Sequence, residues 1–183
     1  MRMMKQNNLA SVYLHLITDG RDSPPTSGLN YIAQVKQVIA SGVGVGSIAS
    51  VMGRYWAMDR DRRWDRTEKA YSALTKGNGA TATSAEEAIQ SSYAKGITDE
   101  FIEPTVILGN DHQPIATMRD GDALIFFNFR IDRPRQLTRA FILKDFSKAN
   151  SGWGFDPYSV KYRKSHLERA VDTVTPPFDR GEK

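Results

Sequence analysis

Arginine and aspartate gather in three short clusters of this sequence. The clusters lie in TDGRDSPP at residues 18–25, in MGRYWAMDRDRRW at residues 52–64, and in FNFRIDRPRQ at residues 127–136. A planar guanidinium binds a carboxylate or a phosphate through paired hydrogen bonds, so converging arginines are typical of a site for such anions. The aspartates among them either hold the guanidiniums in place or act as a general base toward a hydroxyl group.

Each cluster directly follows an apolar run that has the composition of a buried strand. These runs lie at residues 12–17, 46–52 and 123–129, and we expect the last of them, ALIFFNF, to be the clearest buried strand. Apolar residues at helical spacing predict helices at residues 28–40, 63–74, 85–95 and 135–143. This alternation predicts an α/β fold, with a mostly parallel sheet sandwiched by helices in a single domain. Ligands bind outside the carboxyl ends of such strands, where we expect the three clusters to meet.

Shorter signals complete this outline. Ser84 followed by Glu87 is a capping box, which predicts that the helix at residues 85–95 begins there. A short strand is expected within residues 101–108, followed by a turn of the kind that links hairpin strands. The last 39 residues, 145–183, are dominated by glycine, proline, tyrosine and basic residues, and predict a surface excursion or linker with one short helix at most, near residues 166–171.

The composition narrows the class of protein. A chain of 183 residues with 40% hydrophobic residues suits one domain with an ordinary core. The net charge of +4 is compatible with anionic ligands but is too small to indicate nucleic acid by itself. Cysteine is absent, which excludes disulfides, thiolate metal sites and a cysteine nucleophile. No apolar run has the length of a membrane span, so we expect a soluble cytoplasmic protein without a membrane partner.

Other interpretations of the polar and aromatic residues were weighed against an anion site. An arginine–aspartate pair after a strand is also typical of a solvated turn or a structural ion pair. Aromatic residues beside arginines can stack on nucleic-acid bases, but Tyr55, Trp56 and Trp64 fit core and rim positions better, so we expect no nucleic-acid partner. The three histidines are scattered without metal-ligand spacing, and we expect no metal site in this chain.

Long motifs at all three clusters resemble one enzyme family. DGRDSPP, GRYWAMDRDRRWDRTEKAY and DALIFFNFRIDRPRQLTRAF are similar to segments of cofactor-independent phosphoglycerate mutase, the 2,3-bisphosphoglycerate-independent type. The resemblance runs through most of residues 10–145, includes SAEEAIQSSYAKGITDEFIEPTVI between the motifs, and recurs in FDRGEK at the C-terminus. Several long motifs in the family's order make the match highly specific.

The resemblance implies a two-domain glycolytic enzyme that interconverts 3-phosphoglycerate and 2-phosphoglycerate. A phosphatase-like domain carries two divalent metal ions, commonly manganese, and a serine that forms a phosphoserine intermediate. An α/β transferase domain inserted into it binds the glycerate moiety, and this chain is similar to most of that inserted domain only. We therefore expect the chain to be a fragment that has no cofactor of its own, is inactive alone, and has the phosphatase-like domain as its partner.

The resemblance also implies which residues bind the substrate. These residues are Arg21, Asp22, Arg54, Arg60, Arg130 and Arg133. Asp22 matches the aspartate proposed to exchange a proton with the glycerate hydroxyls, so it is the catalytic residue that we expect. Asp19, by contrast, is expected to shape the turn.

The resemblance suggests a division of the chain and leaves one alternative function. We expect residues 1–146 to form the substrate-binding domain, and residues 147–183 to be an insertion and a linker toward the phosphatase-like domain. The alternative is a stand-alone binding module for glycerate-like or phosphorylated anions. The arginine clusters suit either function, because both need several guanidiniums around a small anion.

Overall fold

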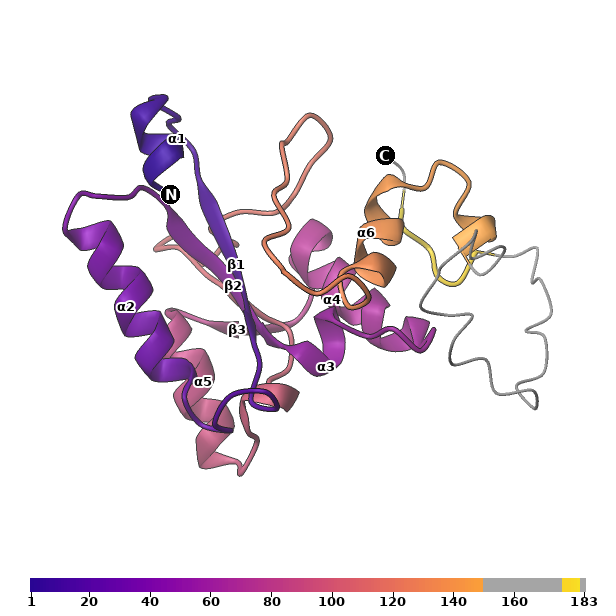
Figure 1. Cartoon of the computed structure of the whole chain (residues 1–183), viewed down its shortest axis with the longest axis horizontal. Helices are drawn as coiled ribbons and strands as arrows, with labels where there is room; N and C mark the ends of the chain where they lie inside the picture. The colour runs from indigo at the N-terminus through magenta and orange to yellow at the C-terminus, as the bar shows by residue number, and fades with distance from the viewer. Residues whose placement is uncertain (150–175, 182–183) are drawn as a thin grey trace.

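Four strands form one sheet at the centre of the computed structural model, which describes residues 1–149 and 176–181 (Figure 1). The strands lie in the order β1-β2-β4-β3 and are β1 (Tyr13–Thr18), β2 (Ser47–Gly53), β3 (Ala80–Ala82) and β4 (Thr105–Ile107). The β1–β2 and β3–β4 pairs are parallel, whereas β2 and β4 are antiparallel. The predicted α/β fold with a mostly parallel sheet is confirmed, with one antiparallel pair in the middle.

Longer helices cover both faces of this sheet (Figure 1). One face carries α2 (Gly28–Ala40) and α5 (Ala85–Ala94), and the other carries α4 (Trp64–Lys76), against which α6 (Arg135–Ile142) packs. Successive side chains of a strand point to opposite faces, so β2 contributes to both layers. Its Val51 packs in the core beside α2 and α5, and its Met52 packs in the larger core beside α4 and α6.

Predicted and observed elements agree closely where the sequence pattern is long. All four predicted helices are present, and each begins and ends within two residues of its expected limits. Ser84 caps α5 as predicted, because its Oγ accepts a hydrogen bond from the Glu87 N–H at 3.1 Å. A bridge between Leu108 and Pro114 confirms the turn after β4.

Several short elements were not predicted, because three to five residues are too few for a period to show. Besides β3, they are α1 (Arg2–Gln6), α3 (Arg54–Ala57) and the two 3₁₀-helices η1 (Asp99–Phe101) and η2 (Phe146–Ala149). Among residues 1–149 and 176–181, none of the helices combines the length and apolar character that crossing a membrane requires.

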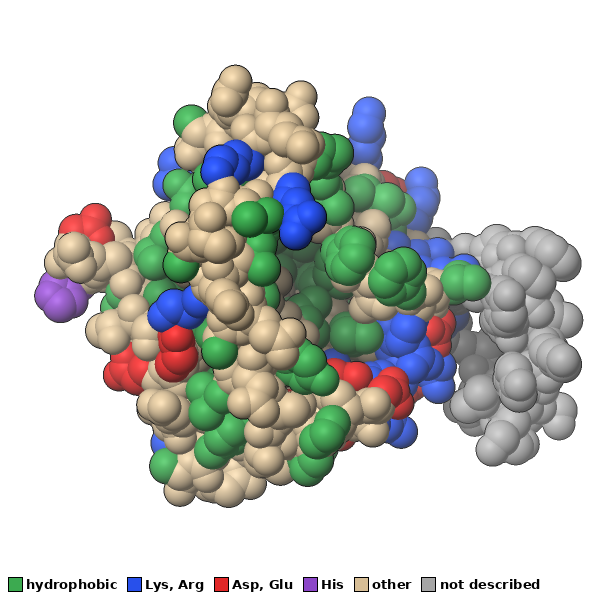
Figure 2. Space-filling model, turned by 60° about the vertical axis from the view of Figure 1, so that its left-hand side comes forward, with side chains coloured by type: hydrophobic (Ala, Val, Ile, Leu, Met, Phe, Trp, Pro, Cys, Tyr) green, Lys and Arg blue, Asp and Glu red, His purple; other side chains and the backbone are tan. Residues whose placement is uncertain are grey.

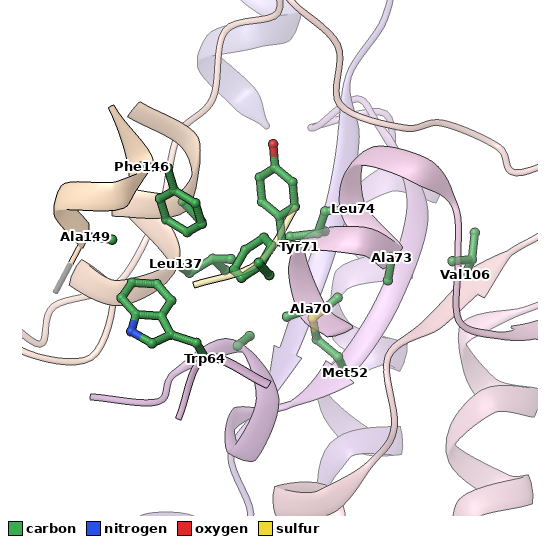
Figure 3. Close-up of a cluster of buried hydrophobic side chains, with 13 residues drawn as sticks. Met52, Trp64, Ala70, Tyr71, Ala73, Leu74, Val106, Leu137, Phe146 and Ala149 are labelled. Carbon is green, nitrogen blue, oxygen red and sulfur yellow. The ribbon is translucent and has the colours of Figure 1, made fainter. Parts of the chain in front are cut away.

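The larger core cluster lies between the sheet and helices α4 and α6 (Figure 3). It is rich in aromatic rings that meet edge to face, with ring centres 5.5 Å apart for Trp64 and Phe146 and 4.8 Å apart for Phe146 and Phe178. Phe178 belongs to the C-terminal FDRG segment, whose Arg180 donates to the carbonyl of Leu143 at 2.7 Å. This segment is therefore packed on the domain. Residues 147–149 of the predicted insertion belong to η2, and Ala149 is part of the larger core cluster. Residues 150–175, including the helix expected near residues 166–171, lie outside the described residues.

The predicted buried strand at residues 123–129 is wrong. This segment is irregular, pairs with none of the described strands, and leaves Phe127 83% and Phe129 91% exposed. An apolar run becomes a buried strand only where a neighbouring strand pairs with its backbone and another layer covers its side chains. Of its apolar side chains, Phe126 packs in part against the larger core cluster. The third arginine cluster therefore follows an irregular segment rather than a strand.

Candidate functional site

The carboxyl ends of β1 and β2 bring the first two clusters together. Thr18 and Gly53 lie opposite one another in the parallel register, so Asp19 and Arg54 leave the sheet at the same edge. Arg54 is only 3% exposed, and its Nη1 donates to the Asp19 carboxylate at 2.5 Å. Asp19 also accepts from the backbone N–H of Asp22 at 3.2 Å, which shapes the turn as expected.

Asp22 links the first cluster to the other two. One of its carboxylate oxygens accepts from Nη1 of Arg54 at 2.8 Å and from Nη1 of Arg130 at 3.0 Å. The hydrogen bond from Arg54 is the main cause that lowers the pKa of Asp22, and the charges of Arg54, Arg130 and Arg21 lower it further. Asp22 is therefore ionised and accessible, and two arginines hold its carboxylate.

Arg60 and Arg133 connect the second cluster to the third. Arg60 forms an ion pair with Asp132, and Nη1 of Arg133 donates to the carbonyl oxygen of Met58 at 3.1 Å. The Nε of Arg133 is buried and has no hydrogen-bond partner among the described residues. Burial and the positive charges of Arg60 and Arg54 lower the pKa of Arg133. A bound anion would satisfy the unpaired donor and offset this repulsion.

Arg21 is the most exposed of the predicted ligands. Its side chain is 60% exposed, and its Nη1 lies 3.7 Å from the Glu100 carboxylate. An exposed ion pair of this length contributes little to stability, so Arg21 can change partner at low cost.

A cavity of about 280 Å³ lies where the clusters meet. Its walls include four of the predicted ligands, Arg21, Arg54, Arg60 and Arg133. Of the two other predicted ligands, Asp22 pairs with Arg54, and Arg130 pairs with Asp22. Acidic and basic side chains also lie side by side on the face shown in Figure 2, next to a hollow with apolar walls.

A second cavity, of about 320 Å³, lies between β1 and α2. Its walls are largely apolar, with Leu16, Ile32 and Val35 among them, and none of the described arginines or lysines lines it. The arginine cavity is therefore the one whose chemistry suits an anion.

Two further side chains line the arginine cavity: Arg66, which lies outside the three clusters, and Asp59, which belongs to the second cluster but was not among the predicted ligands. Arg66 lines it and stacks on Tyr55, with its guanidinium carbon 3.6 Å from the ring centre. The sequence offered one signal for Arg66: it lies three residues after Arg63, and residues three apart lie on the same side of a helix. Asp59 is 4% exposed, and its carboxylate lies 3.4 Å from Arg63 and 3.7 Å from Arg66.

Asp99 holds the loop that carries the first cluster. It is 1% exposed, and its carboxylate accepts from the backbone N–H groups of Ser27 at 2.9 Å and Gly28 at 2.8 Å, at the start of α2. Its own N–H donates to the carbonyl of Pro25 at 2.8 Å, and its carbonyl accepts from Thr18 Oγ1 at 2.7 Å. Asp99 thus ties together both ends of the DGRDSPP loop.

Comparisons with known proteins place the chain among related sequences. A family model described as "BPG-independent PGAM N-terminus" matches residues 1–171. The 2,3-bisphosphoglycerate-independent phosphoglycerate mutase of Moorella thermoacetica is 54% identical over 144 residues, which cover 79% of this chain and 28% of that protein. The enzyme of the same name from Myxococcus xanthus is 46% identical over 83% of this chain and 29% of its own length.

A solved structure gives the same result in three dimensions. A crystal structure of Leishmania mexicana phosphoglycerate mutase at low cobalt concentration matches the chain with a TM-score of 0.73 and 32% sequence identity. The match covers 77% of this chain and 27% of that one. The chain thus spans less than a third of the length of these relatives.

Proposed function

Because the chain belongs to the family of 2,3-bisphosphoglycerate-independent phosphoglycerate mutases, we propose that it holds the glycerate moiety while such an enzyme interconverts 3-phosphoglycerate and 2-phosphoglycerate. Arg21, Arg54, Arg60, Arg130 and Arg133 are the proposed ligands of the carboxylate and phosphoryl oxygens. The observation that carries the proposal is the arginine cavity, whose Arg133 keeps a buried donor without a partner in the described part of the chain.

The substrate would change the state of the catalytic aspartate. Arg54 and Arg130 pair with Asp22 in the structure and lower its pKa. A carboxylate or phosphoryl group that enters the cavity competes for the same guanidiniums, and the pKa of Asp22 then rises toward its ordinary value. Asp22 becomes a better acceptor for a glycerate hydroxyl proton just when the substrate is present. Several guanidiniums also keep the glycerate bound while it reorients between the two transfers.

The metal ions of the family do not fit the described residues of this chain. Residues 1–149 and 176–181 contain no group of three side chains that suits a metal ion. The carboxylates at the site are engaged by arginines instead, as in the pairs of Asp22 with Arg54 and of Asp132 with Arg60. We therefore propose that the serine nucleophile and the metal ions, commonly manganese in this family, belong to a phosphatase-like partner domain, and that the chain alone is inactive. The intact enzyme would act in cytoplasmic glycolysis.

Calorimetric titration with 3-phosphoglycerate tests the proposal. We expect measurable binding to the chain and about a tenfold loss of affinity in Arg130→Ala, which removes a charge-assisted hydrogen bond from an exposed position. Arg119→Ala is the matched control, because it removes the same charge from an exposed arginine that, unlike Arg130, does not pair with Asp22. No binding by the unaltered chain, or equal losses in both variants, would refute the proposed function.

A further inference from the structure

We propose that Gln136 is a positioning residue that fixes the distance between the second and third arginine clusters. The inference rests on the proposed function, since it concerns how the same site grips an extended substrate. Gln136 lies in the first turn of α6, three residues after Arg133, and is only 1% exposed. It is not among the residues that line the arginine cavity, so it would act through other side chains.

Both ends of the Gln136 carboxamide are engaged. Its Oε1 accepts from the backbone N–H of Arg62 at 3.0 Å, and its Nε2 donates to Oγ1 of Thr67 at 2.7 Å. Thr67 belongs to α4 and is also 1% exposed. A backbone N–H can only donate, which fixes the orientation of the amide and leaves its nitrogen for the threonine hydroxyl. Gln136 therefore joins α6, α4 and the loop before α4.

The loop that Gln136 holds needs this support. Arg62 has a φ of 62°, in the left-handed region that is unfavourable for residues with a side chain. On its other side, the carboxylate of Asp59 accepts from the N–H groups of Asp61 at 2.9 Å and Arg63 at 3.0 Å. The loop is thus fixed from both sides, and Arg60 lies within it.

Besides a contact of the Asn128 amide nitrogen with the Met58 sulfur at 3.6 Å, two further links between these clusters involve proposed substrate ligands. They are the ion pair of Arg60 with Asp132 and the hydrogen bond from Arg133 to the carbonyl of Met58. Both guanidiniums are expected to change partner when an anion binds. The contacts of Gln136 are buried and uncharged, so they persist in the bound state. The spacing of Arg60 and Arg133 around a bound substrate would then depend on Gln136.

This role predicts a difference between long and short anions. 3-Phosphoglycerate carries negative charge at both ends, so arginines of two clusters must lie at a fixed distance from each other to bind both ends at once. Inorganic phosphate is small enough to be held by one cluster. Removing the hydrogen bonds of Gln136 should therefore weaken the binding of 3-phosphoglycerate far more than the binding of inorganic phosphate.

Calorimetry with both ligands on Gln136→Met tests the inference. Methionine keeps the length of the side chain but removes both hydrogen bonds, and we expect about a tenfold loss of affinity for 3-phosphoglycerate with less than about a twofold change for phosphate. Ile89→Val is the matched control, because it alters a buried residue on the opposite face of the sheet and should leave both affinities unchanged. If Gln136→Met does not fold, the same two titrations are made on Thr67→Val, which removes only the acceptor for Gln136 Nε2. The same difference between the two ligands is expected there.

The possible results separate the inference from the proposed function. No 3-phosphoglycerate binding by the unaltered chain would refute the proposed function itself. If the unaltered chain binds but a folded Gln136→Met protein loses affinity for both ligands by the same factor, Gln136 merely supports the fold. Unchanged affinity for 3-phosphoglycerate would likewise overturn the positioning role.

Discussion

Replacing Asp99 with alanine should release the loop that carries the first arginine cluster. The Asp99 carboxylate is buried and accepts from the N–H groups of Ser27 and Gly28, at the start of α2, and from the hydroxyl of Tyr93. Alanine leaves these donors without the charged acceptor. Loss of a helix cap costs about 0.5–2 kcal/mol, and a hydrogen bond to a charged group is worth about 1.5–3 kcal/mol. Because these terms overlap, we expect Asp99→Ala to lower the free energy of unfolding by about 3 kcal/mol.

Urea denaturation measures this loss directly. With a slope of about 2 kcal/mol per molar urea, the midpoint should fall by about 1.5 M. Tyr93→Phe is the matched control, because it keeps the carboxylate and removes the hydroxyl that donates to it and accepts from the Gly28 N–H at 3.3 Å, which should cost about 1.5 kcal/mol. A loss below about 1 kcal/mol for Asp99→Ala, or one no larger than that of Tyr93→Phe, would contradict the role given to Asp99.

Three further predictions concern the fold around the site. Gly53→Ala should lower the free energy of unfolding, measured by urea denaturation, by about 3 kcal/mol, because the added Cβ would lie 2.2 Å from the carbonyl oxygen of Glu100. Gly96 has open space around it but a φ of 74°, so Gly96→Ala should lower the free energy of unfolding by only about 1 kcal/mol. Burial lowers the pKa of His15 from 6.5 to about 4, so the unfolded chain binds this proton at a higher pH than the folded chain does. The free energy of unfolding should therefore fall by about 2–3 kcal/mol between pH 6.5 and 4. The contribution of His15 to this fall should be absent in His15→Asn. Changing Phe127 and Phe129 to serine should alter the free energy of unfolding by less than about 0.5 kcal/mol, because both rings are exposed; a larger loss would mean that they are packed.

The sequence predicted the parts of the fold whose signal is local and long. The 13 residues of α2 show an apolar face throughout, and its limits were predicted without error. The Asp19–Arg54 pair was also foreseeable, since both residues directly follow strands that turned out to be parallel neighbours.

The parts that the sequence could not predict depend on distant residues. ALIFFNF has the composition of a buried strand, but composition does not reveal whether a neighbouring strand is available to pair with it. Asp99 lies 81 residues from Thr18, so its capping of α2 appears only in the folded chain. The contacts of Gln136 could not be predicted either, because its partners Arg62 and Thr67 are about 70 residues away in the sequence.

The central claim is that all three clusters form one anion site, and nuclear magnetic resonance of the arginine side chains tests it most directly. The Nε–H signals of Arg54, Arg60, Arg130 and Arg133 would be followed while 3-phosphoglycerate is added to the chain. We predict that these signals shift together along one binding curve, with Arg133 prominent because its Nε–H gains a partner. Signals that shift with separate affinities, or that do not move while arginines elsewhere do, would contradict a shared site.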